Sequence, residues 1–527
     1  MTSPLRQHRS PAGFRWPRRT LWDDVARHAV EHPGATAVSD GDGGYTYRGL
    51  VDSTLLLSGR YRQMGVRHGD VVIVQMHGVR QFVPAFLAAE RLGAVVSPIL
   101  PAIDGKAFGE IVDLACPALV VTANDPDTLE GTGVTPVVSA APSGPGPRLD
   151  ALLDGRCPGR GLPDPPAPHD LSELAFTSGT TDRPKGVLHT HATATAGILS
   201  TISRQGIEAS DVVHVALPVG HNFGYFYGVR LGLHAGAHVV LQARWNPDRM
   251  LEACARYGVT VSSGPPAFLV DLLGCRSKWR GRLDSLRLFT CAGAKLALDT
   301  AREVVDKLPG RMSKAFGMTE LGHVCSTTAG APTDKLLETE GHPHPEIQMR
   351  VLGTGGEWLG REQEGEIAFR GPFLMFGYHG GGSPEAIDED GFFRTGDLGY
   401  TDRDGYLVIT GRVKNMVIRG GENIPAERVE RALAGHELLR DAAVVGVPDR
   451  RLGERPVACV QARPGFVPRT ADLAEFLQRA GIPPIHCPEA VVVVEEIPRG
   501  PTGKVRRAHL RGLASGVAAF EQGGCDG

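Results

Sequence analysis

The segment Thr177-Ser178-Gly179-Thr180-Thr181-Asp182-Arg183-Pro184-Lys185-Gly186 follows directly on the apolar run 174–176. A short apolar run bounded by turn residues predicts a buried strand, and this strand feeds a loop of glycines and hydroxyl side chains. Such a loop offers backbone N–H groups and hydroxyls to a polyphosphate, with Lys185 as the counter-charge. The alternative is a surface turn, which is the commonest use of Gly, Thr and Pro; the GK[ST] ending of a Walker loop is missing.

Short apolar runs alternate with helix-like stretches on both sides of this loop. The expected strands are 71–74, 94–96, 118–121, 174–176, 212–215, 239–241, 259–261 and 286–289, with a helix at 82–91. This alternation predicts parallel β-sheet covered by helices, and the segment 155–168, rich in Pro and Gly, predicts a surface connection.

The pattern changes after Gly411. Helices are expected at 426–433 and 473–479, with strands at 442–447, 457–460 and 491–494. These elements are enough for a small α+β domain. The sequence therefore predicts an α/β protein with a large N-terminal domain of sheets covered by helices, residues 1–410, and a small mobile C-terminal α+β domain, residues 411–527.

Composition and charge are those of a soluble globular protein. The 527 residues are 42% hydrophobic and 22% charged, with a formal net charge of -3, which gives no support for a nucleic-acid partner. The nine cysteines include no CxxC pair, so a disulfide framework or zinc site has little support. No segment approaches 18 consecutive apolar residues, and the arginine-rich N-terminus lacks an apolar core. We expect a cytoplasmic protein that is neither exported nor membrane-spanning.

Further motifs follow the loop in order along the chain. They are Phe316-Gly317-Met318-Thr319-Glu320, Phe393-Arg394-Thr395-Gly396-Asp397-Leu398, Gly411-Arg412-Val413-Lys414-Asn415, Gly420-Gly421-Glu422-Asn423 and Pro498-x-x-x-Thr502-Gly503-Lys504. With the loop, they resemble the adenylate-forming superfamily: acyl- and aryl-CoA synthetases, aryl-acid AMP ligases, adenylation domains of nonribosomal peptide synthetases, and luciferases. The resemblance covers almost the whole chain and is strongest to the aryl-acid AMP ligases and the aromatic or alicyclic acyl-CoA synthetases.

The resemblance implies a site for ATP and Mg²⁺. The residues it assigns to ATP and AMP are Thr177, Ser178, Gly179, Thr180, Thr181, Lys185, Gly293, Ala294, Lys295, Phe316, Gly317, Met318, Thr319, Asp397 and Arg412. Glu320 would supply the hard oxygen ligand that Mg²⁺ prefers. Asp397 could accept both ribose hydroxyls, and Arg412 could add a forked contact to ribose or phosphate. Taken alone, each of these charged residues could equally be ordinary surface charge.

Lys504 is the expected catalytic residue of adenylation. A carboxylate that attacks the α-phosphate needs no general base, because it is already ionised near neutral pH. It needs a cation that stabilises the oxygens gaining charge, and by resemblance Lys504 supplies it. Lys414 occupies the position of the domain hinge, whose rotation would exchange Lys504 for Gly420 and Gly421, where a pantetheine arm could pass close to the backbone. Without the other motifs, Lys504 would be part of a solvated basic tail and the two glycines an ordinary turn.

The acid pocket is expected near the run Pro218-Val219-Gly220-His221-Asn222-Phe223. The residues that the resemblance assigns to it are His221, Asn222, Phe223, Gly293, Gly317 and Met318, with His221 also a candidate catalytic residue. A histidine in an apolar loop can equally be a packed, satisfied side chain. The stretch 223–228 contains no aspartate to hold an α-ammonium group, so a non-amino acid with a ring or bulky hydrocarbon is favoured.

Four residues depart from the superfamily pattern: Asp182 stands in place of a glycine, Phe316 of a tyrosine, Asn415 of an aspartate, and His486 of a lysine. The charge of Asp182 beside a triphosphate is unfavourable and predicts weaker ATP binding unless the side chain points away. The other three changes leave adenylation intact in this interpretation and bear on the thiol step.

The sequence predicts an AMP-forming acid–thiol ligase. It would convert an acid and ATP to acyl-AMP and pyrophosphate, then form a thioester with CoA, without nucleic-acid or membrane partners and with a homodimer as one possible assembly. One alternative is adenylation alone, with transfer to a carrier-protein phosphopantetheine or a separate transferase. Two others are a luciferase-like oxygenase that adenylates first and a non-catalytic nucleotide-binding regulator.

Overall fold

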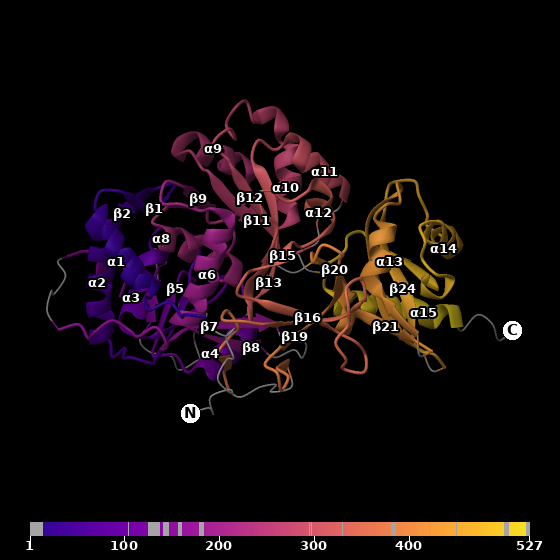
Figure 1. Ribbon diagram of the computed structural model, residues 1–527, viewed down its shortest axis with the longest axis horizontal. Coiled ribbons are helices and arrows are strands. Elements are labelled where there is room, and N and C mark those ends of the chain that lie inside the picture. The colour runs from indigo at the N-terminus through magenta and orange to yellow at the C-terminus, as the bar shows by residue number, and fades with distance from the viewer. Residues whose placement is uncertain are drawn as a thin grey trace.

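The computed structural model forms a larger and a smaller body, which lie side by side in Figure 1. It describes residues 14–103, 105–124, 137–140, 147–155, 161–178, 184–294, 296, 298–328, 330–380, 386–420, 422–449, 451–499 and 505–522. The larger body runs from the N-terminus through the indigo, magenta and salmon elements. The smaller body contains the orange and yellow elements near the C-terminus.

A seven-stranded sheet holds the phosphate-loop segment. Its order is β18-β8-β7-β4-β3-β5-β6. The strands are β3 (Val71–Gln75), β4 (Val95–Pro98), β5 (Leu119–Thr122), β6 (Val137–Ser139), β7 (Leu171–Ser178), β8 (Pro184–Thr190) and β18 (Gly377–Tyr378). Strands β3 to β7 pair in parallel, whereas β8 runs antiparallel to β7. Helix α4 (Gly105–Ala115) packs on one face of this sheet through Phe108 and Ile111.

A nine-stranded sheet of order β15-β14-β13-β12-β11-β9-β10-β1-β2 forms the second large layer. Its strands are β1 (Thr36–Asp40), β2 (Gly43–Thr46), β9 (Val212–Val215), β10 (His238–Leu241), β11 (Val261–Gly264), β12 (Leu288–Ala292), β13 (Arg311–Met318), β14 (Gly322–Ser326) and β15 (His342–Pro343). Helices α9 (Pro247–Tyr257), α10 (Pro266–Gly274) and α11 (Leu298–Lys307) cover its outer face.

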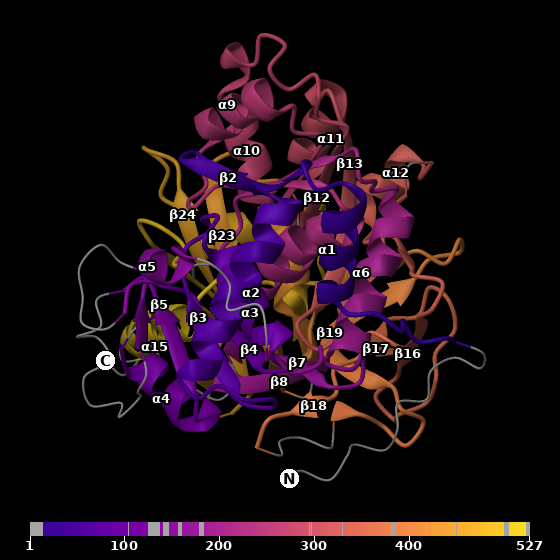
Figure 2. The same cartoon turned by 90° about the vertical axis from the view of Figure 1, so that its left-hand side faces the viewer.

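The main hydrophobic core lies between these two sheets. It takes Val72 and Val121 from the first sheet and Val213 and Val239 from the second. The helices that fill the space are α1 (Leu21–Glu31), α2 (Tyr47–Gln63), α3 (Phe82–Arg91), α6 (His191–Gln205) and α8 (Leu231–Ala235), and Figure 2 shows α1, α2, α3 and α6 from the side. Sheets covered by helices are the predicted α/β architecture, which is confirmed.

A third sheet, which the sequence did not predict, links the larger body to the smaller one. It is antiparallel, of order β16-β17-β19-β20, with β16 (Gln348–Leu352), β17 (Gly365–Arg370), β19 (Phe393–Thr401) and β20 (Leu407–Arg412). The sequence analysis extended the parallel pattern over this region. The pairing is instead between neighbouring strands in the chain, with no crossover helix among the described residues from β16 to β20.

The smaller body contains the sheet β22-β21-β24-β23 with β25 paired to β24. Its elements are β21 (Met416–Arg419), β22 (Glu422–Pro425), β23 (Leu439–Asp449), β24 (Gly453–Ala462), β25 (Ala490–Val493), α13 (Ala426–Leu433), α14 (Thr470–Arg479) and α15 (Arg507–Gln522). A single 3₁₀ turn, η5 (Val413–Asn415), separates it from β20. The domain division at residue 410 stays a prediction, but the change of sheet falls between Arg412 and Met416.

Several predicted helices and strands have the bounds that the structure shows. The helices at 82–91 and 426–433 and the strand at 212–215 have the predicted bounds. The strands expected at 259–261 and 286–289 begin two residues later, at Val261 and Leu288. Val259 and Leu286 are buried in the connections that precede them, so apolar burial there does not mark strand.

Of the nine cysteines, the seven that the structure describes are free; Cys157 and Cys525 lie outside the described residues. Among the described helices, none combines the length and the apolar character that crossing a membrane requires.

A buried charge cluster lies between the two large sheets. Arg230 closes the π-helix η2 (Tyr225–Arg230) and forms an ion pair with Glu90 of α3. Its Nη1 also donates to the Tyr225 hydroxyl at 3.2 Å. Glu173 of β7 is fully buried nearby, and burial raises its pKa well above the usual range. The guanidinium therefore pairs with the Glu90 carboxyl, which would otherwise be isolated in the core, and lowers the pKa values of both acids.

Replacing Arg230 by Met should lower the free energy of unfolding by about 3–5 kcal/mol at pH 7.5, because it leaves buried carboxylates without a cation. The matched control is Lys278→Met, which breaks the exposed pair with Asp248 and should leave the free energy of unfolding nearly unchanged. Urea unfolding followed by tryptophan fluorescence measures both.

The difference in the free energy of unfolding between the parent chain and the Arg230→Met variant should decrease as the pH falls toward 5. Arg230 lowers the pKa values of Glu90 and Glu173, which burial raises, so its loss raises both further and protonation stabilises the folded variant more than the folded parent. A loss equal to that of Lys278→Met, independent of pH, would contradict this account of the cluster.

Candidate nucleotide and acid site

The phosphate-loop segment connects two antiparallel strands rather than a strand and a helix. Thr177 pairs with Lys185, and Ser178 with Pro184, so the loop closes the β7–β8 hairpin. The residues at its tip, Gly179, Thr180, Thr181, Asp182 and Arg183, lie outside the described residues. The hairpin fixes Lys185 at the mouth of the loop.

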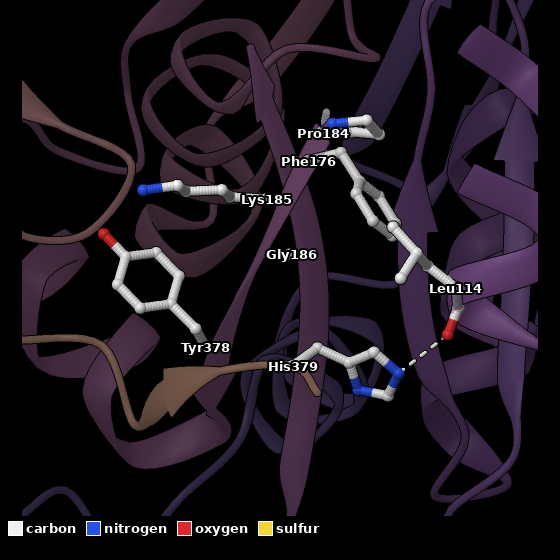
Figure 3. A pocket seen from close by; sticks show the side chains of 7 residues that line it. All are labelled: Leu114, Phe176, Pro184, Lys185, Gly186, Tyr378 and His379. Carbon is white, nitrogen blue, oxygen red and sulfur yellow. Dashed lines mark hydrogen bonds between the residues drawn. The ribbon is translucent and has the colours of Figure 1, made fainter. Parts of the chain in front are cut away.

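Lys185, Tyr378 and Glu320 form a chain of contacts beside the loop. The ammonium of Lys185 lies 5.8 Å from the centroid of the Tyr378 ring, and Figure 3 shows its side chain reaching toward that ring. The Tyr378 hydroxyl donates to Oε1 of Glu320 at 3.1 Å. Burial and the Glu320 carboxylate raise the pKa of Tyr378, so the phenol keeps its proton. One tyrosine thus contacts both a cation and a carboxylate.

A cavity of about 110 Å³ opens next to this contact chain. Its walls are Phe176 and Lys185 of the hairpin, Leu114 of α4, and Tyr378 and His379. Nε2 of His379 donates to the Leu114 carbonyl at 2.9 Å, which ties β18 to α4.

The turn that carries Glu320 is anchored from two sides. Strand β13 ends with Phe316, Gly317 and Met318. The turn from β13 into β14 contains Thr319 and Glu320. Nε2 of His189, on β8, donates to the Thr319 carbonyl at 2.8 Å. The Met375 N–H donates to the Glu320 carbonyl at 2.7 Å. The mostly buried Glu320 side chain is therefore positioned against the hairpin strand that starts at the loop.

Asp397 and Arg412 form an ion pair across neighbouring strands of the third sheet. The two residues are in register on β19 and β20, and Nε of Arg412 lies 2.6 Å from Oδ1 of Asp397. Asp397 is buried, and its N–H donates to Oγ1 of Thr395 at 3.0 Å. Lys414 follows in η5, at the start of the smaller body.

Gly293 and Ala294 directly follow the last residue of β12. They lie beside the part of β13 that contains Phe316 and Gly317. Parallel strands β12 and β13 end at the same edge, the edge at which α/β sheets bind ligands. Gly293 has a φ of +89°, which favours glycine. A Cβ on Gly317 would lie 2.2 Å from the Gly322 carbonyl oxygen, so only glycine fits there. Lys295 lies outside the described residues.

His221 begins the helical turn α7 (Asn222–Gly224). Its Nδ1 accepts the Phe223 N–H at 3.2 Å, which caps the turn and leaves the ring proton on Nε2 in the neutral form. Phe223 packs edge-on against His323, with 5.5 Å between the ring centroids. The structure therefore shows a capping role for His221, and its predicted catalytic role stays a prediction.

A small second cavity lies behind Phe223. It has a volume of about 20 Å³, and Tyr227 and His323, which also line it, stack in parallel with centroids 3.5 Å apart. The sequence analysis missed both residues. Their positions in the sequence could have indicated both residues. His323 pairs across the strands with Gly317, a predicted pocket residue, and Tyr227 lies in the 223–228 stretch.

The predicted pantetheine segment lies in the smaller body. Gly420 has a φ of +58° in the turn of the β21–β22 hairpin, and Nε2 of His486 lies 3.1 Å from Oε1 of Glu422 on β22. Gly421 and Lys504 lie outside the described residues. Among the residues described, no three His, Cys, Asp or Glu side chains cluster as a metal site.

Three features of this site are typical of an enzyme that binds a nucleotide at the edge of its sheets. They are the hydroxyl-rich β7–β8 hairpin, the turn that carries Glu320, and the glycines Gly293 and Gly317 at the ends of β12 and β13. The chain belongs to the AMP-binding enzyme family: the family model matches residues 25–379, and the model of the AMP-binding enzyme C-terminal domain matches residues 428–504. The superfamily resemblance inferred from the motifs is confirmed.

Individual relatives are similar to this chain over nearly its whole length. It is 32% identical over 537 residues to the salicyl-AMP ligase / salicyl-S-ArCP synthetase of Mycobacterium tuberculosis, covering 97% of this chain and 94% of the relative. It is 30% identical to the 2-hydroxy-7-methoxy-5-methyl-1-naphthoate–CoA ligase of Streptomyces carzinostaticus, covering 96% and 95%. The structure of ATP-bound MatB from Rhodopseudomonas palustris is similar with a TM-score of 0.86 and 27% identity, covering 95% of this chain and all (100%) of MatB.

Proposed function

We propose that this chain joins a carboxylic acid other than an amino acid to AMP, releases pyrophosphate, and then forms the acid's thioester with CoA. The observation that carries this proposal is the contact chain from Lys185 through Tyr378 to Glu320 beside the hydroxyl-rich hairpin. It sets a cation and a hard oxygen ligand where a triphosphate would enter. The named activities of the relatives support the same chemistry.

In the first step, a carboxylate oxygen attacks the α-phosphorus of ATP. A new P–O bond forms, the bond to the pyrophosphate oxygen breaks, and no proton has to move because the acid is already ionised. In the second step, the CoA thiol attacks the acyl carbon, loses its proton, and AMP leaves. The residues must therefore neutralise and align anions rather than transfer protons.

The proposed nucleotide contacts involve residues near the hairpin, the third sheet and the ends of β12 and β13. Thr177, Ser178 and Lys185 would hold phosphate oxygens, and Asp397, which pairs with Arg412, would accept the ribose hydroxyls. Gly293 and Phe316 would border the adenine. Glu320 has the donor chemistry that Mg²⁺ prefers, and the ion when bound would neutralise charge on the phosphates.

Lys504 is proposed as the cation that completes the site during adenylation. Its ammonium would stabilise the oxygens that gain charge, and the turn at Lys414 would act as the hinge that delivers it. Rotation there would bring the Gly420 turn to the site for the thiol step. A group that arrives only for one step can serve that step without blocking the next.

The acid pocket is proposed to lie between Phe223 and the strand-edge glycines Gly293 and Gly317. The second cavity continues it, and none of the described residues that line this cavity carries a carboxylate. An α-ammonium group would have no counter-ion there, which disfavours amino acids. Aromatic walls favour a ring or a bulky hydrocarbon.

We expect acid-dependent exchange of labelled pyrophosphate into ATP with aromatic or alicyclic acids, without any need for CoA. Added CoA should then yield the thioester and AMP in equal amounts. Absence of exchange with every acid in a panel of benzoates, naphthoates and cyclohexanecarboxylates would contradict the proposed function. Exchange without a CoA thioester would point to the alternative, in which a carrier protein or a transferase accepts the acyl group.

Replacing Lys504 by Ala should lower the rate of adenylation by about 100- to 1,000-fold, because it removes charge stabilisation in the transition state. The same variant should still convert a supplied acyl-AMP and CoA to thioester at close to the normal rate. Arg506→Ala, which removes an exposed cation two residues away, is the matched control and should adenylate normally. Equal loss in both half-reactions would contradict a role confined to adenylation.

A further inference from the structure

Helix α13 of the smaller body covers the open edge of the third sheet. Strand β20 ends that sheet, so one of its two sides has no strand partner among the described residues. An edge strand presents carbonyl and N–H groups that no neighbouring strand pairs. Helix α13 packs against this strand, and Figure 1 shows the two elements next to each other. The smaller body therefore contacts the larger one outside the single turn that joins them.

Arg431 of α13 supplies the hydrogen bonds of this contact. Its Nη2 donates to the carbonyl oxygen of Ile409 at 3.3 Å and to that of Thr410 at 3.2 Å. The register of β20 against β19 passes from Gly411 to Ile409, so Thr410 faces no partner residue there. Glu364, directly before β17, adds an attractive charge near the guanidinium. A cation of the smaller body thus binds backbone carbonyls of the larger body.

The start of α13 lies against the end of β20. A Cβ on Gly411 would lie 3.1 Å from Oε2 of Glu427 and 3.7 Å from Cβ of Pro425, so the two segments are in close contact. Asn415, in the turn η5 between them, donates through Nδ2 to Oε1 of Glu427. Nη2 of Arg507 lies 3.2 Å from the same oxygen. The Asn415 amide therefore links the turn to the smaller body without placing a second negative charge beside Glu427.

Rotation at the turn would break these contacts, because Arg431 and its carbonyl partners belong to different bodies. The Arg431 side chain is exposed, so after rotation both the guanidinium and the carbonyls would bind water instead. A hydrogen bond that is exchanged for water contributes little net free energy. The contact is therefore strong enough to shift an equilibrium between two arrangements and too weak to prevent their exchange.

We propose that Arg431 and Asn415 are positioning residues of a clasp between the two bodies. Arg431 binds the β20 carbonyls, Asn415 binds Glu427, and together they favour the arrangement of the smaller body seen here. Loosening the clasp transfers population to the arrangement that serves the other half-reaction. The inference rests on the proposed function, because it takes adenylation and thioester formation to use two arrangements of the bodies.

Separate measurements of the two half-reactions test the clasp. Pyrophosphate exchange with an acid that the parent chain uses reports adenylation, and thioester formation from the supplied acyl-AMP and CoA reports the second step. Arg431→Gln should slow one half-reaction and accelerate the other, which changes the ratio of their rates about 3- to 10-fold. The two rates move in opposite directions because population lost from one arrangement is gained by the other.

Three further variants separate the clasp from general effects of charge. Asn415→Asp should shift the ratio in the same direction as Arg431→Gln, since it places a second carboxylate against Glu427. Arg431→Lys keeps the charge but loses the planar guanidinium, and should shift the ratio less. Arg428→Gln is the matched control and should leave the ratio unchanged. Arg428 is exposed on the same helix and forms no hydrogen bond or ion pair with the described residues.

Hydrogen exchange measured by mass spectrometry gives a second readout that requires neither reaction. The amides of β20 should exchange faster in Arg431→Gln than in the parent chain, because α13 then covers the edge strand for less of the time. Arg428→Gln should leave this exchange unchanged.

The outcomes are distinct. A ratio of rates that stays the same in Arg431→Gln, or two half-reactions that slow together, would overturn the clasp. A shift of equal size in Arg428→Gln would also overturn it, because the effect would then come from the net charge of α13. Absence of pyrophosphate exchange with every acid would overturn the proposed function itself, and unchanged hydrogen exchange of β20 in Arg431→Gln would then overturn the clasp independently.

Discussion

The constraint on which the rest of the structure depends is electrostatic: a carboxylate has to approach a triphosphate. Two unit charges 4 Å apart repel by about 4 kcal/mol at an effective dielectric constant of 20, and the triphosphate carries several such charges. In the proposed site, Lys185 at the hairpin and Arg412 beside Asp397 would offset part of this repulsion. Mg²⁺ at Glu320 and the ammonium of Lys504 would supply the remaining stabilisation in this proposal.

The proposal assigns fixed charged groups and a mobile cation to different parts of the chain. Lys185 lies on a paired strand and Glu320 is buried in a turn, and both belong to the large sheets. Lys504 lies outside the described residues, and in the sequence it follows the single turn at Lys414. This division suits a two-step reaction, because the second step needs the first cation to leave.

The sequence predicted the parts of the site that depend on local chemistry. The strand before the loop, the helix at 82–91 and the AMP-binding family followed from short motifs and periodicity. The antiparallel third sheet was missed, because pairing between strands depends on contacts that periodicity does not encode. Tyr227 and His323 lie beside predicted pocket residues but in no phosphate motif, and their stack, which joins residues 96 positions apart, could not be predicted from periodicity.

The most direct test follows oxygen atoms from the acid. An acid labelled with ¹⁸O in both carboxylate oxygens is converted fully to its CoA thioester, and the AMP and pyrophosphate are analysed by mass spectrometry. Attack of the carboxylate on the α-phosphorus predicts that each AMP carries one ¹⁸O and that pyrophosphate carries none. AMP without label, or label in pyrophosphate or inorganic phosphate, would contradict the account.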